Sequence, residues 1–203
     1  PDHPVVDANA LDAAQKTLDE MKNLTGPAPL TMQLQAQLHA AQGKLEPARD
    51  AIQVALKNGP DYLPAMALGA EIYLQLGAAE QAERLARQIV ERVPNAMQGH
   101  RLLAMSQMRM NAPDKAMQTL QPWLDRNVAD PSLYALAGEA ALRANDAARS
   151  AAYFERAIQL DPSDPRKKTG LAFAHLAAGQ QERGIAELEI GRASCRERVY
   201  SGV

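Results

Sequence analysis

The sequence has few of the residues that cross-link a compact domain or fill its core. Cys195 is the only cysteine among 203 residues, so no disulfide can form within the chain. Aromatic residues make up 4% of the chain, within a hydrophobic share of 46%, and this balance favours close packing of helices over a bulky sandwich core. No apolar run approaches the ~20 residues that span a bilayer, so we expect no membrane span in this segment.

Signals for chemistry are missing as well. The formal net charge is −2 and no basic stripe is present, which argues against a nucleic-acid partner. The histidines lack metal-ligand spacing, the serines lack the surroundings of a nucleophile, and no glycine cluster resembles a phosphate-binding loop. We therefore expect no catalytic residue, no metal and no cofactor.

The most informative pattern is an interval of 34 residues. Small residues recur at this interval, at Ala48, Ala82, Ala116, Ser150 and Gly184. Residues that form turns follow the same interval, at Gly43, Gly77, Asn111, Asn145 and Gly179. A period of this length predicts an all-α solenoid, in which each unit buries its apolar face only against its neighbours.

Each unit is predicted to be a pair of antiparallel helices. The first helix ends at the Gly or Asn of the turn, because these residues readily adopt the left-handed conformation that closes a helix. The second helix stops before Pro60, Pro94 or Pro162, since proline removes a backbone donor. The small residue lets the two helices approach closely. His39 and His175 share one repeat position, which indicates packing between helices.

The unit at 97–130 departs from this pattern. Trp123 takes the position of Ala55 and Ala157, and Pro122 should kink the second helix or end it early. Methionines are concentrated in this unit, where they either fill space around Trp123 or form an adaptable ligand surface. Met105 and Met108 are the pair that we expect to be exposed.

The interval divides the chain into repeats. We assign a partial repeat with only a second helix to 1–28, repeats to 29–62, 63–96, 97–130 (atypical) and 131–164, and a truncated repeat to 165–189. The apolar pattern fails at Ile190, and residues 189–199 resemble one reading frame of a sequencing adapter. We interpret 190–203 as a non-native tail; the alternative is a genuine basic C-terminus. Without capping helices at its ends, the array is expected to self-associate or fray.

Two units carry a family resemblance. Ala82, Ala86, Ile89 and Pro94, and then Tyr134, Gly138, Phe154, Ala157 and Pro162, match the spacing of the tetratricopeptide repeat (TPR). This resemblance implies a right-handed superhelix whose concave face is lined by the first helix of each pair. It places a protein or peptide ligand in that groove.

The resemblance turns the repeat positions into candidate groove residues. Those we select are Gln37, Glu71, Leu74, Arg101, Met105, Met108, Glu139, Leu142 and Phe173. The basic clamp with which some TPR domains hold a terminal carboxylate is not matched, because Gln33, Gln37, Ala67 and Glu71 stand at its positions. An apolar or amphipathic segment of another protein fits such a groove better.

A weaker resemblance concerns the setting. Residues 61–65, 136–140 and 184–188 are similar to the TPR lipoproteins of bacterial PEP-CTERM/exosortase and exopolysaccharide systems. That similarity implies a non-catalytic scaffold in the periplasm or envelope, whereas without it a cytoplasmic protein is equally compatible. The alternative is a regulatory or docking region of a larger enzyme, such as a glycosyltransferase.

Overall fold

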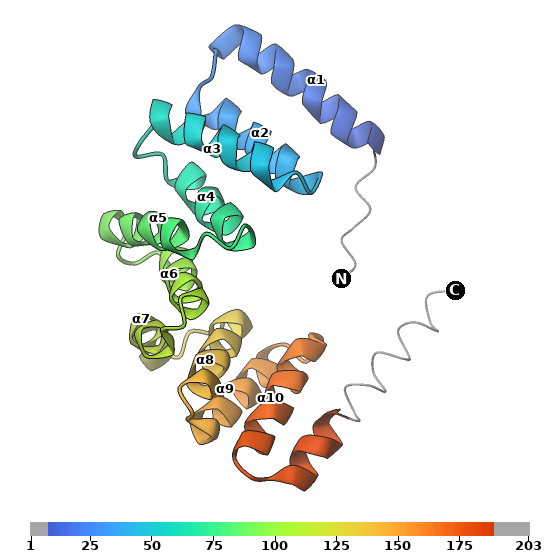
Figure 1. The fold of residues 1–203 in the computed structure, drawn as a ribbon, viewed down its shortest axis with the longest axis vertical. Coiled ribbons are helices and arrows are strands. Elements are labelled where there is room, and N and C mark those ends of the chain that lie inside the picture. The colour runs from blue at the N-terminus through green and yellow to red at the C-terminus, as the bar shows by residue number, and fades with distance from the viewer. Residues whose placement is uncertain (1–7, 189–203) are drawn as a thin grey trace. The chain divides into compact units, whose positions relative to one another are not determined.

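The structure is a computed structural model that describes residues 8–188 (Figure 1). This part of the chain is helical without strands, which confirms the all-α class. It forms two compact units, which we call unit 1 (residues up to Met110) and unit 2 (from Asn111). The proposed tail 190–203 and its Cys195 lie outside the described residues.

The helices of both units follow the interval of the sequence. Unit 1 contains α1 (Ala8–Thr25), α2 (Pro29–Ala41), α3 (Leu45–Asn58), α4 (Leu63–Gln75), α5 (Ala79–Arg92) and α6 (Met97–Arg109). Unit 2 contains α7 (Pro113–Asp125), α8 (Pro131–Arg143), α9 (Ala147–Leu160) and α10 (Pro165–Ala177), and residues 181–188 are helical too. Consecutive helices pack as pairs, such as α2 with α3, α4 with α5 and α8 with α9.

The turns between paired helices have the predicted backbone. Gly43, Gly77, Asn111, Asn145 and Gly179 have φ values between 57° and 76°. An L-residue other than Gly or Asn is disfavoured there, because its Cβ crowds the following carbonyl oxygen. The residue type at these positions therefore sets where each first helix ends.

Close approach within a pair depends on the small residues. Ala48, Ala82 and Ser150 are completely buried. The Ser150 hydroxyl also donates to the carbonyl oxygen of Gly138 at 2.8 Å, which links α9 to α8. A Cβ on Gly184 would lie 2.6 Å from Leu176 Cγ. The predicted reason for small side chains at this position is thus confirmed.

The helix α7 ends early, as Pro122 predicts. Pro122 lies inside α7, which stops at Asp125, and Asn127 then adopts a left-handed φ of 51°. Trp123 is 9% exposed, and the Arg126 guanidinium lies 5.1 Å from its ring centroid. A proline near the end of a helix and a left-handed residue after it are sufficient to shorten the helix.

The helix α1 packs on α2 partly through polar groups. Its Leu18 is buried, but Gln15 and Lys22 also donate to the side chain of Gln35, at 3.4 and 2.6 Å. Gln35 in turn lies 3.2 Å from His39 Nε2. Desolvation by burial lowers the pKa of His39, and the charges of Lys44 and Lys22 lower it further.

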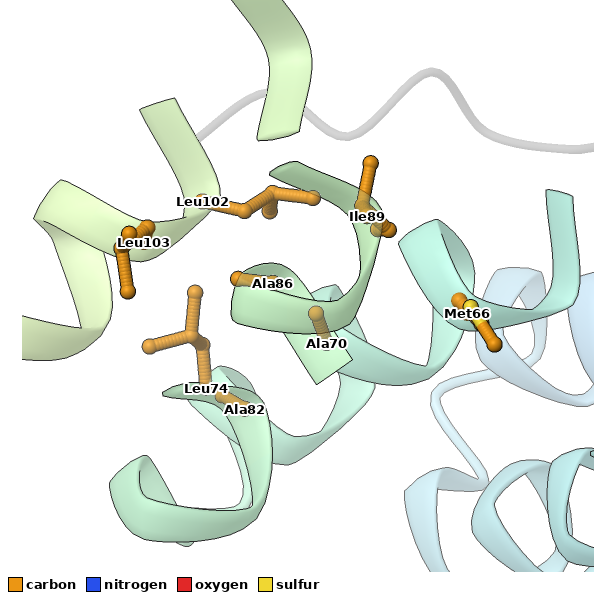
Figure 2. Packing of buried hydrophobic residues seen from close by; sticks show 8 residues of the cluster. All are labelled: Met66, Ala70, Leu74, Ala82, Ala86, Ile89, Leu102 and Leu103. Carbon is orange, nitrogen blue, oxygen red and sulfur yellow. The ribbon is translucent and has the colours of Figure 1, made fainter. Parts of the chain in front are cut away.

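The core of α4, α5 and α6 is aliphatic. Figure 2 shows its buried members, which are Met66, Ala70, Leu74, Ala82, Ala86, Ile89, Leu102 and Leu103. Alanines on α5 bring that helix close to α4, and Leu102 and Leu103 of α6 pack into the same cluster. This packing leaves Glu71 of α4 outside the cluster.

Candidate functional site

One position of each first helix faces away from the core. Its residues, spaced at the interval of the sequence, are Gln37, Glu71, Met105, Glu139 and Phe173. Gln37 and Glu139 are exposed, Glu71 is half-buried, and Met105 and Phe173 are 39% and 51% exposed. Single exposed apolar side chains are common on protein surfaces, so Met105 and Phe173 do not by themselves mark a binding site.

Two predicted groove residues are instead core residues. Leu74 is 6% exposed and belongs to the cluster of Figure 2, and Met108 is 4% exposed. Each lies three residues after the outward position, which turns it about 60° back toward the packed side of its helix. The prediction that they are open to a ligand is therefore wrong. Arg101 and Leu142 are half-buried.

Unit 1 contains a pocket of about 420 Å³ at this outward face. Its lining comes from α2, α4, α5, the turn after α5, and the start of α6: Gln33, Gln37, Leu63, Pro64, Ala67, Leu68, Glu71, Ile89, Val93, Ala96 and Gln98. Two predicted residues, Gln37 and Glu71, thus share one pocket. We call this site the α2–α4 pocket.

The α2–α4 pocket has an apolar wall that the sequence did not reveal. Ile89, Val93 and Ala96 come from the second helix of a pair and from the turn behind it. Val93 remains 37% exposed, although it is a branched aliphatic residue. The groove prediction used only first helices. The repeated proline marks the end of α5 at Pro94, but it does not indicate that the neighbouring Val93 and Ala96 line a pocket.

The polar groups of the α2–α4 pocket are mostly amides. Gln33 accepts a hydrogen bond from the Tyr62 hydroxyl at 3.1 Å, whereas Gln37 and Gln98 are exposed. Glu71 is the single ionisable residue of the lining, and no residue in the described chain pairs with its carboxylate. The site can therefore offer amide hydrogen bonds, apolar contacts and one negative charge.

A second hollow, of about 520 Å³, lies between α3 and α5. It is lined by Glu46, Arg49, Gln53, Tyr73, Leu76, Ala78, Gln81 and Arg84. Arg49 forms ion pairs with Glu46 and, at 2.7 Å, with Asp50. Glu46 and Asp50 neutralise Arg49, but Arg84 also lines this hollow and forms no ion pair within residues 8–188. The hollow therefore offers one positive charge, whereas the α2–α4 pocket offers one negative charge.

Residues 8–188 show no other arrangement typical of a functional centre. They contain no cluster of His, Cys, Asp or Glu that could hold a metal, and none of their helices is long and apolar enough to cross a membrane. His175 is buried and His39 half-buried, in keeping with the predicted packing positions.

Comparisons with known proteins agree with the fold. The tetratricopeptide repeat family matches residues 131–164. A TPR protein from Parabacteroides merdae superimposes with a TM-score of 0.78 at 19% identity, over 93% of this chain and 75% of that one. A thermophilic TPR protein of Thermus thermophilus, TTC0263, gives 0.70 at 18% identity, over 84% and 93%.

A third similar structure is of a protein whose description names a binding site. YrrB, described as a TPR protein with an unusual peptide-binding site, has a TM-score of 0.66 at 13% identity, over 87% of this chain and 91% of that one. At such identities these structures are similar in fold alone. Among curated proteins, no sequence matches this chain significantly.

Proposed function

We propose that this chain, which contains a tetratricopeptide repeat at 131–164 and has the fold of TPR proteins, is a non-catalytic scaffold that binds a segment of another protein. The α2–α4 pocket is the binding site. The observation that carries this proposal is that Gln37 and Glu71, from two successive repeats, share a pocket with the exposed apolar Val93. Peptide segments bind such surfaces through main-chain hydrogen bonds and inserted side chains.

The size of the pocket fits a segment rather than a whole domain. A volume of about 420 Å³ is near the lower end of the ~300–1,000 Å³ found for small-ligand sites. It has room for a few side chains of a partner. Two further candidates of unit 1, the half-buried Arg101 and the exposed Met105 of α6, are proposed to extend the contact with the same partner.

Peptide display tests this proposal directly. A random seven-residue library is selected on the chain, and the enriched peptides are then measured by fluorescence polarisation against Ala67→Phe, which fills the α2–α4 pocket. Lys57→Phe, on the exposed surface of α3, is the matched control. Binding lost in Ala67→Phe and kept in Lys57→Phe supports the proposal. Absence of enriched peptides, or equal binding to both variants, contradicts it.

The biological setting is a finer part of the proposal. Resemblance at 61–65, 136–140 and 184–188 supports a scaffold of bacterial envelope exopolysaccharide or PEP-CTERM protein-sorting machinery. The parent reading frame decides this point: a signal peptide with a lipidated cysteine and further repeats agrees with it. A catalytic domain in the same frame would instead make this chain the docking region of an enzyme.

A further inference from the structure

The α2–α4 pocket has a charge pattern that restricts its partner. We infer that the segment it binds carries a lysine or arginine next to an apolar side chain, with the cation placed against Glu71. This inference rests on the proposed function, because it names the chemistry of the partner for the same pocket.

The first argument is the isolated charge of Glu71. Its side chain is half-buried, and the pocket lining contains no other ionisable group. No cation in the described chain compensates the carboxylate by an ion pair. A partner that covers Glu71 with apolar or acidic groups would remove it from water without compensation, which is costly. A basic side chain instead replaces the lost hydration with a charge-assisted hydrogen bond.

The second argument is the division of the pocket into amides and an apolar wall. Gln37 and Gln98 are exposed side-chain amides, and each can both donate to and accept from a peptide main chain. Val93 and Ala67 offer an apolar surface within the same lining. An extended segment can therefore place its main chain on the amides, one side chain on Val93 and its cation on Glu71.

The equivalent acid of unit 2 differs in its surroundings. Glu139 is exposed on α8, and its charge raises the pKa of Arg166, after the larger effects of the hydrogen bond and charge of Asp164. Glu139 therefore already has a cation of this chain in its neighbourhood, whereas no side chain of residues 8–188 forms an ion pair with Glu71. The pair gives a matched control, because the same substitution can be made at the same repeat position.

The test uses the three peptides from the display selection that bind most tightly, synthesised with blocked ends. Each has a control copy in which every Lys or Arg is replaced by Gln. We expect the basic peptides to bind the chain about five- to tenfold more tightly than their Gln copies, and the difference to shrink at high salt. In Glu71→Gln this preference should disappear. In Glu139→Gln it should remain. Circular dichroism checks that each variant is folded.

A gain of preference provides an independent check. Gln37→Glu places a second carboxylate in the same pocket and is expected to increase the preference for the basic peptide several-fold further. If pocket-dependent peptides lack basic residues, or bind Glu71→Gln and the unchanged chain with equal preference, the inference is overturned while the proposed function stands. If Ala67→Phe leaves peptide binding unchanged, the proposed function itself fails.

Discussion

The two units start their helices in different ways. In unit 1, helices α2 to α6 follow Ala28, Lys44, Tyr62, Ala78 and Ala96, and none of these side chains caps its helix. In unit 2, α7 is likewise uncapped, but Asp130, Asp146 and Asp164 accept hydrogen bonds from backbone amides at the starts of α8, α9 and α10. Such caps stabilise helices locally.

The two units also differ in the side chains that fill their cores. In unit 1, aliphatic side chains of several helices share the core, as around Ile52 and Leu102. In unit 2, the aromatic ring of Phe154 lies against Gly138 of α8 and Gly170 of α10. Unit 1 therefore packs through aliphatic side chains of several helices, whereas unit 2 adds aspartate caps and an aromatic ring held between two glycines.

Removing the ring should have the largest effect. Phe154→Ala is expected to destabilise unit 2 by about 3–5 kcal/mol, because it leaves a cavity between two helices whose glycines cannot fill it. Trp123, the only tryptophan, lies in unit 2, so its fluorescence during urea unfolding reports on that unit. Unfolding of the whole chain is followed by circular dichroism. An unchanged Trp123 midpoint would contradict a core organised around Phe154.

Adding a methyl group at a packed glycine should destabilise unit 2 more than unit 1, although by less than Phe154→Ala does. A Cβ on Gly170 would lie 2.4 Å from two ring atoms of Phe154, whereas one on Gly69 would meet Ile52 Cγ2 and Leu85 Cδ1 at 2.9 Å. The ends of aliphatic side chains can move, but an enclosed ring cannot shrink. We expect Gly170→Ala to cost about 1–3 kcal/mol.

Gly69→Ala is the matched variant in unit 1. Its gain in helix propensity, about 1 kcal/mol, should offset much of the clash. Urea unfolding by circular dichroism measures both variants. A loss for Gly69→Ala as large as that for Gly170→Ala would show that unit 1 is packed as rigidly as unit 2.

Removing a cap should have a moderate effect confined to unit 2. Asp164 accepts from the Arg166 amide at 3.0 Å, and the Arg166 side chain holds the pKa of Asp164 below its usual range. Asp164→Ala is expected to destabilise α10 by about 1 kcal/mol. Amide hydrogen exchange at the start of α10 measures this loss. Asp164→Asn, which keeps the acceptor but not the charge, should lose less.

The sequence predicted those features that depend on one residue and its immediate backbone. The left-handed turns at Asn111 and Asn145 and the early end of α7 at Pro122 are of this kind. The apolar wall at Val93 depends on how a turn folds over the preceding pair, which the interval does not encode. For the same reason, the burial of Leu74 followed only from the packing of α4 on its neighbours.

The smallest expected effect is the pH dependence of the stability of unit 1. The folded chain holds the pKa of His39 below 6.5, chiefly by burial, so the folded state binds its proton less readily than the unfolded state. Stability from neutral His39 is therefore present above about pH 6.5, and it is lost as the pH falls from there through the lowered pKa. Protonation would place a cation beside Lys22 and Lys44, where α1 meets α2.

His39→Gln isolates this contribution. Between pH 7 and 5, the urea midpoint measured by circular dichroism should fall further for the unchanged chain than for His39→Gln. Trp123 fluorescence, which reports on unit 2, should change equally in both chains over the same range. Because His39 is only half-buried, water screens the added charge and the difference should be smaller than the effect of Asp164→Ala. Equal midpoints for the two chains at every pH would mean that the α1–α2 contact tolerates the charged imidazole.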